Sequence, residues 1–346
     1  MNYLGIDYGE HRVGIAFADS ELKWAFARET NPYDWGDDYS NVSTIARLDV
    51  PMELSIYATG WLRLNDGVDC ETLLRDTSDF YLQDRIWMPY TKGKCFLGSN
   101  DSVGYSVVLG TKTKVHGIST KGRVFLRNGS EVQGNIRFYH CQDSSYCLQK
   151  QQRAKHHHGR VLFRDELYWP YAIQELPPME DVGQREVRVK YGEVLTLQSG
   201  DKFRKLSVAP GGTLRVPMGE FHFGELQMDA SSQIEYVNPG YKSVFHVNGS
   251  CIWRAKLNQL NNLQDSTIIA RGVMLMQHGS ETMFIEGEWA GTILAPNADL
   301  VLGQSNKIVY GRFAGKNVTV HQYATVKIVP FNPTALYEVV FLGGAR

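Results

Sequence analysis

Residues 107–136, VVLGTKTKVHGISTKGRVFLRNGSEVQGNI, contain two consecutive copies of one short pattern. Each copy alternates apolar and polar residues and then turns at Gly, and equivalent residues lie 17 positions apart. A constant spacing of this length is typical of a solenoid, in which each coil stacks its inward residues on those of the next coil. The equivalent pairs are Val107 and Val124, Leu109 and Leu126, Val115 and Val132, and Gly117 and Gly134.

A second pair of copies lies near the C-terminal end, where GTILAPNADLVLG from position 291 aligns with GRFAGKNVTVHQYA from position 311 at a spacing of 20. Stacked Asn side chains can hydrogen-bond along such a column, so Asn297 over Asn317 is interpreted as a structural ladder. The two repeats together predict an all-β fold, a parallel β-helix. An antiparallel sandwich or barrel also has many short strands, but it does not repeat at a constant coil length. The aligned pairs are Gly291 and Gly311, Ile293 and Phe313, Asn297 and Asn317, and Leu300 and Val320.

The composition agrees with a large, turn-rich globular protein. The 346 residues include 36 Lys+Arg and 37 Asp+Glu, which gives a formal charge of -1 and provides no general electrostatic case for nucleic acid as a partner. The hydrophobic content of 43% excludes a disordered chain. No stretch approaches the roughly 20 apolar residues of a membrane helix, so no transmembrane segment is expected.

The pattern along the chain predicts three regions. Residues 1–30 form an N-terminal hairpin segment, residues 31–79 a β-rich linking region, and residues 80–346 the β-helix. The polar stretch at about 148–186 interrupts the repeat and is interpreted as an inserted loop, because loops of that length often carry function.

The block from Gly192 to Tyr236, together with GTILAPNADLVLG and YGRFAGKNVTVHQYATVKIVPF, resembles bacterial cell-surface β-helix proteins of the polymer-forming, choice-of-anchor type. The resemblance covers about residues 80–330. It implies an exported or surface-displayed structural or adhesive protein, with no catalytic residues and no cofactor to carry over. Residues 1–27 contain several acidic residues where a signal peptide would be apolar, so no signal peptide is expected there.

The opening YLGIDYGEHRVGIAFAD is similar to something different, the start of the Holliday-junction resolvase-like family with an RNase H type fold. That resemblance covers about residues 1–28. It implies that Asp7 holds a divalent metal, since Mg²⁺ prefers oxygen ligands and activates water, and it implies a cytoplasmic nuclease. One carboxylate does not make a metal site, so a hairpin without an active centre is the expectation.

The inserted stretch carries the candidate binding residues. Tyr168, Trp169 and Tyr171 are candidates for stacking on sugar rings, although most aromatic residues of β proteins pack in cores. Arg153, Lys155 and Arg160 flank a run of three His residues and could contact an anionic polymer, more readily than the His run could bind a metal. Further sugar-stacking candidates, with the same core alternative, are Trp61, Trp87 and Trp289.

The five cysteines allow two interpretations. In an exported chain, Cys141 could pair with Cys147 and Cys70 with Cys95, which leaves Cys251 free. In a reducing compartment all five would be ordinary thiols.

The function expected from these observations is that of a non-catalytic surface scaffold or adhesin, extracellular or at the cell surface, that binds polysaccharide or other cell-surface components. The first alternative is the Mg²⁺-dependent nuclease based on Asp7. The second is a β-helix enzyme that degrades polysaccharide, which needs paired acidic or basic groups on one outer face. Asp299 and Glu286 are scattered acids without such a pairing motif, so no enzyme is expected.

Overall fold

In the computed structural model the chain divides into two compact units, and each is described by itself. One unit contains residues 1–53, and the other contains most of the remaining chain. The structure describes the backbone of residues 2–9, 12–19 and 24–27, together with residues 55–72, 95–141, 143–157, 159–163, 176, 179, 181–258, 263–304 and 306–329.

The first unit contains a three-stranded antiparallel sheet made of β1 (Asn2–Gly9), β2 (Arg12–Asp19) and β3 (Trp24–Ala27). β1 pairs with β2 along its whole length, and β2 pairs in turn with β3. The short connection between β1 and β2 makes them a hairpin.

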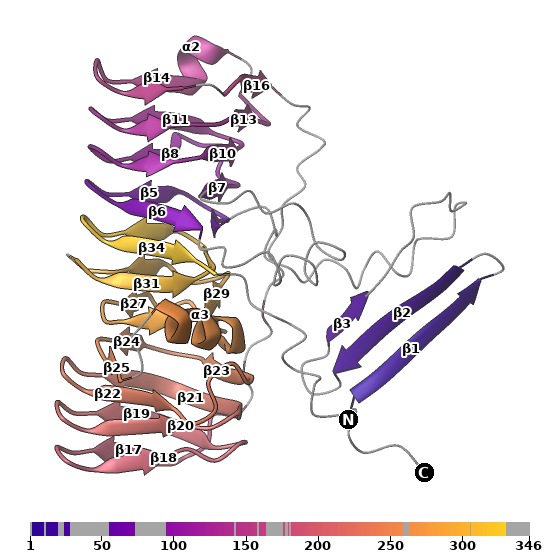
Figure 1. Ribbon diagram of the computed structural model, residues 1–346, viewed down its shortest axis with the longest axis vertical. Coiled ribbons are helices and arrows are strands. Elements are labelled where there is room, and N and C mark those ends of the chain that lie inside the picture. The colour runs from indigo at the N-terminus through magenta and orange to yellow at the C-terminus, as the bar shows by residue number, and fades with distance from the viewer. Residues whose placement is uncertain are drawn as a thin grey trace. The chain divides into compact units, whose positions relative to one another are not determined.

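The second unit is a parallel β-solenoid of about 10 turns (Figure 1), which confirms the predicted fold class. A 20-stranded sheet runs along it, and further strands form a 7-stranded and a 4-stranded sheet. Along most strands the inward residues are apolar and buried, chiefly Val, Leu, Ile and Phe, and they alternate with more exposed residues. This alternation follows from the period of two in a β-strand, and it builds one continuous apolar core along the solenoid.

The elements of the second unit up to residue 163 form the first segment of the solenoid. They are β4 (Ile56–Ala58), β5 (Leu62–Leu64), β6 (Asp69–Thr72), β7 (Phe96–Ser99), β8 (Tyr105–Leu109), β9 (Lys114–Val115), β10 (Gly117–Thr120), β11 (Arg123–Leu126), β12 (Glu131–Val132), β13 (Ile136–Phe138), α2 (Ser144–Cys147), β14 (Leu148–Lys150), β15 (Lys155–His156) and β16 (Val161–Phe163).

The elements after residue 185 form the second segment. They are β17 (Glu186–Val189), β18 (Val194–Thr196), β19 (Lys202–Val208), β20 (Thr213–Val216), β21 (Gly219–Met228), β22 (Gln233–Tyr236), β23 (Ser243–Val247), β24 (Cys251–Trp253), β25 (Lys256–Leu257), α3 (Leu263–Gly272), β26 (Val273–Gln277), β27 (Met283–Ile285), β28 (Trp289–Ala290), β29 (Thr292–Ala295), β30 (Leu300–Leu302), β31 (Ile308–Gly311), β32 (Phe313–Gly315), β33 (Val318–Val320) and β34 (Thr325–Ile328).

The two segments join in an order that differs from the order of the sequence. The last coil, β32 to β34, pairs in parallel with the first coil, β4 to β6. Figure 1 shows this junction in the middle of the stack, where yellow β34 lies next to purple β6. The chain therefore starts the solenoid at its middle, builds to one end, and resumes at the other end to close on its own first coil.

The 17-residue repeat is confirmed by strand pairing. Val107 is the partner of Val124, and Val115 is the partner of Val132. The repeated residues are inward and buried, which explains why their identity recurs.

The 20-residue repeat holds only in its first half. Ile293 pairs with Phe313 as predicted, but Leu300 pairs with Val318, so its alignment with Val320 is wrong. Four residues connect β29 to β30, and only two connect β32 to β33, which shortens the spacing from 20 to 18.

The solenoid includes two stretches that were assigned from the sequence to a linking region and to an inserted loop. Residues 56–72, predicted to lie in a linking region, form a complete coil. Residues 148–163, predicted to begin an inserted loop, form β14, β15 and β16, which pair with β11, β12 and β13. The coil was hard to predict because these residues are mostly polar and few inward residues are fully buried, so the apolar alternation is weak.

The cysteines form the two pairs considered from the sequence. Disulfides join Cys70 to Cys95 and Cys141 to Cys147, and both lie in the first segment. Cys251 is a free thiol in the second segment, and burial raises its pKa to about 12, so it stays protonated and unreactive.

Candidate functional site

One outward position of the 20-stranded sheet recurs through the whole solenoid, and we call its residues the outer stripe. Each pairs with the next in parallel register, so their side chains form a single column at the strand spacing of about 4.8 Å. All are exposed or partly exposed, and none is acidic. The outer stripe consists of Arg188, Ser207, Gln227, Ile252, Phe284, Val301, Thr319, Arg63, Val108, Phe125 and Gln149.

Near one end of the outer stripe, an arginine contacts two aromatic rings. The Arg123 guanidinium carbon is 4.5 Å from the centre of the Tyr105 ring and 4.7 Å from that of the Tyr146 ring. Phe125 of the outer stripe adds a third ring, 5.3 Å from Tyr105. We call these four residues the Arg123 cluster. These two cation–π contacts restrict the motion of the guanidinium.

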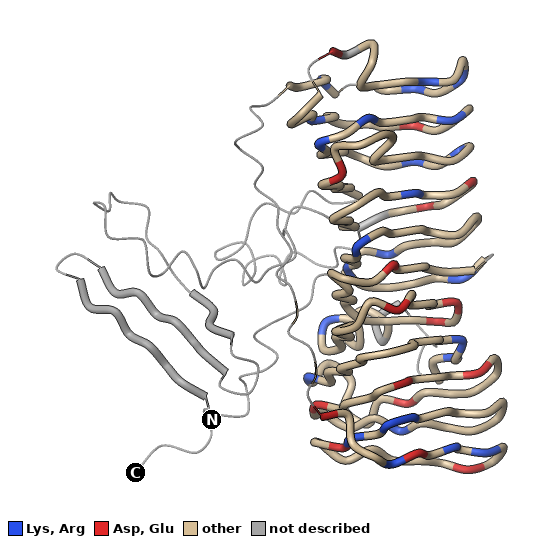
Figure 2. Tube along the Cα trace, turned by 180° about the vertical axis from the view of Figure 1, so that it is seen from behind, with Lys and Arg blue, Asp and Glu red and all other residues tan. Residues whose placement is uncertain are grey.

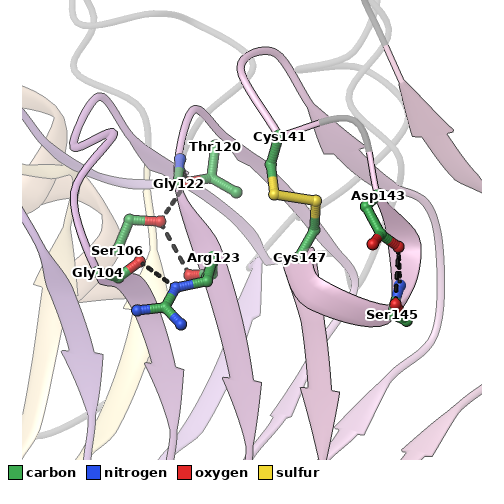
Figure 3. The surroundings of a disulfide bond; sticks show 9 residues. All are labelled: Gly104, Ser106, Thr120, Gly122, Arg123, Cys141, Asp143, Ser145 and Cys147. Carbon is green, nitrogen blue, oxygen red and sulfur yellow. Dashed lines mark hydrogen bonds between the residues drawn. A yellow bond between two sulfur atoms is a disulfide. The ribbon is translucent and has the colours of Figure 1, made fainter.

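The strand corner before β11 places Arg123 (Figure 3). Its backbone N–H and its Nε both donate to the carbonyl oxygen of Gly104, at 3.2 and 3.3 Å. The Ser106 hydroxyl donates to the carbonyl of Arg123 at 3.0 Å. A Cβ at Gly122 would lie 2.6 Å from the carbonyl oxygen of Asp101, so only glycine fits this close approach.

A disulfide loop holds the Tyr146 ring of the Arg123 cluster. Tyr146 lies in the short helix α2, which the Cys141–Cys147 disulfide ties to the preceding turn (Figure 3). Asp143 caps this helix by accepting hydrogen bonds from the Ser145 hydroxyl at 2.7 Å and the Ser145 N–H at 2.9 Å, and these bonds lower the pKa of its carboxyl. Tyr146 is 55% exposed, so its ring can contact a ligand.

The coils around the Arg123 cluster are strongly basic. Residues 95–163, which we call the basic coils, contain ten Lys or Arg and three Asp or Glu, an excess of seven positive charges with His neutral. Residues 175–329, which we call the neutral coils, contain fifteen of each sign. Figure 2 shows blue positions outnumbering red ones at the end of the solenoid that contains the basic coils.

In the neutral coils, ion pairs between successive strands neutralise part of the charge. Six Lys and Arg side chains lie opposite Asp or Glu one coil away, which is the favourable arrangement for cross-strand neighbours. The pairs are Lys202 with Asp181 at 2.9 Å, Lys205 with Glu225 at 2.6 Å, Arg215 with Glu235 at 3.1 Å, Lys242 with Glu220 at 3.1 Å, Arg254 with Glu286 at 2.5 Å, and Arg204 with Glu186.

Three histidines form a second cluster, on another outward column of the neutral coils. The rings of His222 and His246 are stacked at 4.8 Å with a 9° interplanar angle, and His246 Nδ1 lies 2.9 Å from His278 Nε2. Burial, followed by His222, His278 and Lys242, lowers the pKa of His246 to about 3, so the ring is neutral at pH 7. Burial also lowers the pKa of His222.

This histidine column does not have the geometry of a metal site. The ring nitrogens of two parallel, stacked imidazoles point in parallel directions and do not converge on one ion. Among the described residues, no group of three or more His, Cys, Asp or Glu is placed to hold a metal ion.

The predicted basic residues lie in the basic coils. Lys155 in β15 pairs in register with Glu131, and the backbone N–H groups of Arg153 and Arg160 donate to turn Asn side chains at 3.3 and 2.8 Å. All three side chains are exposed. In the neighbouring His run, His156 Nε2 lies 2.8 Å from the carbonyl oxygen of Gly134.

The predicted aromatic residues have different outcomes. Tyr168, Trp169 and Tyr171 lie outside the described residues, as does Trp87. Trp289 is fully buried against Trp253, so its role is in the core and it does not bind sugar.

Trp61, in contrast, is partly exposed, and the guanidinium of Arg63 lies 4.4 Å from the centre of its ring. It therefore adds a second arginine–aromatic contact beside the outer stripe.

The predicted asparagine ladder is replaced by a different contact. Because of the 18-residue spacing, Asn317 lies opposite Asp299 and not opposite Asn297. Asn317 Nδ2 donates to Asp299 Oδ1 at 2.8 Å, and Asn317 Oδ1 accepts from the Trp61 N–H at 3.0 Å. Asn317 thus links three successive coils across the junction of the two segments.

The remaining candidate is Asp7. It lies in β1 opposite Gly14, and its side chain is outside the described part of the structure.

Sequence reasoning missed the Arg123 cluster although a signal was present. Tyr105 and Arg123 are 18 residues apart, close to the 17-residue coil length, so they were bound to be near neighbours on adjacent coils. Tyr146 could not be placed in this way, because a helix and a disulfide interrupt its coil.

Comparisons with known proteins identify no family for this chain. No described helix has the length and apolar character to cross a membrane. No protein-family model, curated protein or solved structure matches the chain.

Proposed function

We propose that this chain is a non-catalytic scaffold of the adhesin type that binds polysaccharide along the outer face of its solenoid. The observation that carries this proposal is the outer stripe, in which one partly exposed residue recurs on every coil in an unbroken parallel column. A long polymer of repeated units can contact such a column at many successive coils. Many weak contacts then add up to firm binding.

The acidic residues support a structural role more than a catalytic one. Glu286 is paired with Arg254, and Asp299 accepts a hydrogen bond from Asn317. A glycosidase requires two carboxyl groups facing one bond of the substrate, with one held protonated. The partners of these two acids favour a structural role instead.

The disulfides support a location outside the cytosol. Two disulfides in one chain are typical of oxidising compartments, and this agrees with an extracellular or cell-surface protein. The finer assignment, to polymer-forming surface proteins with an anchor, is part of the same proposal and rests on the motif resemblance alone.

The test is binding of the purified full-length chain to a panel of neutral and acidic polysaccharides, measured by interferometry, with reducing-end release assayed in parallel. The expected result is binding to at least one polysaccharide without cleavage. Cleavage would favour the β-helix enzyme, and absence of binding to the whole panel would refute the proposal. Mg²⁺-dependent cleavage of branched DNA, abolished by Asp7→Asn, would instead establish the nuclease.

A further inference from the structure

We infer that the polysaccharide is acidic and that the Arg123 cluster of the basic coils binds its carboxylate groups. This inference rests on the proposed function and adds the class of ligand and the residues that select it. Three observations support it: the free edge of the Arg123 guanidinium, the exposed ring beside it, and the uncompensated charge of the surrounding coils.

The guanidinium edge is the first observation. The Arg123 guanidinium contacts the rings of Tyr105 and Tyr146, and its Nε donates to the carbonyl oxygen of Gly104. Among the described residues, no carboxylate pairs with Arg123, and its two terminal nitrogens have no partner. A planar guanidinium presents such nitrogens side by side, the geometry that accepts both oxygens of one carboxylate.

The ring of Tyr146 is the second observation. It is 55% exposed next to that guanidinium, on a helix that a disulfide holds in place. A uronic acid residue carries its carboxylate on the sugar ring. One such residue can therefore place its apolar ring face near an aromatic side chain and its carboxylate at the arginine.

The charge of the basic coils is the third observation. Their excess of seven positive charges contrasts with the neutral coils, where acidic residues equal the basic ones in number and several Lys and Arg are in ion pairs. In the basic coils, only some of the described Lys and Arg residues form ion pairs. One that does is Arg127, whose guanidinium lies 3.8 Å from the Asp66 carboxylate. The positive electrostatic potential of the excess Lys and Arg attracts a polyanion and concentrates it at this end of the solenoid.

Nucleic acid is the competing polyanion, and the structure favours polysaccharide. The disulfides indicate an oxidising compartment. The Arg123 guanidinium already contacts two aromatic rings, and its pair of terminal nitrogens matches the two oxygens of a carboxylate.

The experiment compares three immobilised probes by interferometry with the full-length protein: polygalacturonate, its fully methyl-esterified form, and single-stranded DNA. Polygalacturonate is expected to bind, with an affinity that falls as salt is added. The methyl ester, which lacks the charge but keeps the sugar ring, is expected to bind at least about tenfold more weakly.

Variants then locate the site. Arg123→Ala is expected to weaken polygalacturonate binding about tenfold, and Arg123→Lys about threefold, because lysine keeps the charge but loses the planar pair of donors. Tyr146→Ala tests the ring. Arg204→Ala is the matched control, since it removes one exposed positive charge from the neutral coils, and its binding is expected to stay unchanged. The thermal unfolding midpoint of each variant verifies that it is folded.

The outcomes separate the inference from the proposed function. Equal binding of polygalacturonate and its methyl ester, or equal losses for Arg123→Ala and Arg204→Ala, would overturn the inference and leave the scaffold proposal standing. Tighter binding of single-stranded DNA would also overturn it, in favour of nucleic acid. Failure of every polysaccharide in the wider panel would refute the proposed function itself.

Discussion

The basic coils and the neutral coils share one backbone plan but differ in their outer surface. Both stack parallel strands on a Val-, Leu- and Ile-rich core, and both contribute to the outer stripe. In the neutral coils, Lys and Arg face Glu or Asp one coil away, as in the pair Arg215 and Glu235. In the basic coils the acids are few, both disulfides lie in or next to them, and Arg123 pairs with rings instead of carboxylates.

The inward residues of both regions form one continuous core, and the two regions differ in their outward residues. Changes to inward residues should therefore affect stability most, and changes to outward residues should affect it least.

The largest effect is expected from the core of the neutral coils. Phe223→Ala should cost about 3–5 kcal/mol of unfolding free energy, because Phe223 is fully buried and stacked between Phe203 and Phe245. Denaturant unfolding measures the loss. The control is Phe125→Ala on the outer stripe, which should cost much less, since its ring is partly exposed; equal costs would contradict the division between inward and outward positions.

The next effect is a pH dependence that belongs to the neutral coils. The pKa of His246 is lowered to about 3 in the folded state, from about 6.5 when unfolded, so between these values the unfolded chain binds more protons. Stability should therefore be unaffected by this group above pH 6.5 and should fall as the pH drops towards 3, by at most about 1.4 kcal/mol per pH unit.

Urea unfolding at a series of pH values tests this prediction. His246→Phe keeps a ring that can stack on His222 and removes the titrating group, so it should flatten the profile between pH 6.5 and 4. A profile identical to that of the unaltered chain would show that other groups cause the pH dependence.

A smaller effect is expected from the Cys141–Cys147 disulfide at the end of the basic coils. Replacing both cysteines by Ser should cost about 2 kcal/mol by the loop-entropy estimate for so short a loop. Hydrogen exchange should rise in α2 and β14 and stay unchanged in the neutral coils. Increased exchange throughout the solenoid would mean that the two regions unfold as one unit.

The smallest effect is expected from the ion pairs of the neutral coils. Arg215→Ala should cost less than about 1 kcal/mol, because the pair is partly exposed to solvent, which screens it. The measurement is the urea midpoint at low and high salt, where the difference between variant and unaltered chain should shrink with salt. A loss above that range would show that charge balance contributes substantially to the stability of these coils.

The sequence predicted the coils best where inward identity repeats at constant spacing, as in Val107 and Val124. It failed where turn lengths differ, as between Leu300 and Val318, because a two-residue change in a turn shifts all later pairings. It also missed the coil formed by residues 148–163, where polar residues hide the alternation. The coil spacing was enough to predict that Tyr105 and Arg123 are neighbours. Predicting the position of Tyr146 would also have required the positions of helix α2 and the Cys141–Cys147 disulfide, which no local pattern encodes.

The sequence alone thus determined the fold class, because the period of two within strands and the constant coil spacing follow from stacking inward side chains. Only the tertiary structure decided the order of the coils, with β32 to β34 closing on β4 to β6. The physical reason is that every coil exposes the same unpaired backbone groups at its edge, so local sequence does not specify which coil pairs with which. Partner choice depends on contacts between distant segments, as when Asn317 bonds to the Asp299 carboxylate and the Trp61 backbone N–H.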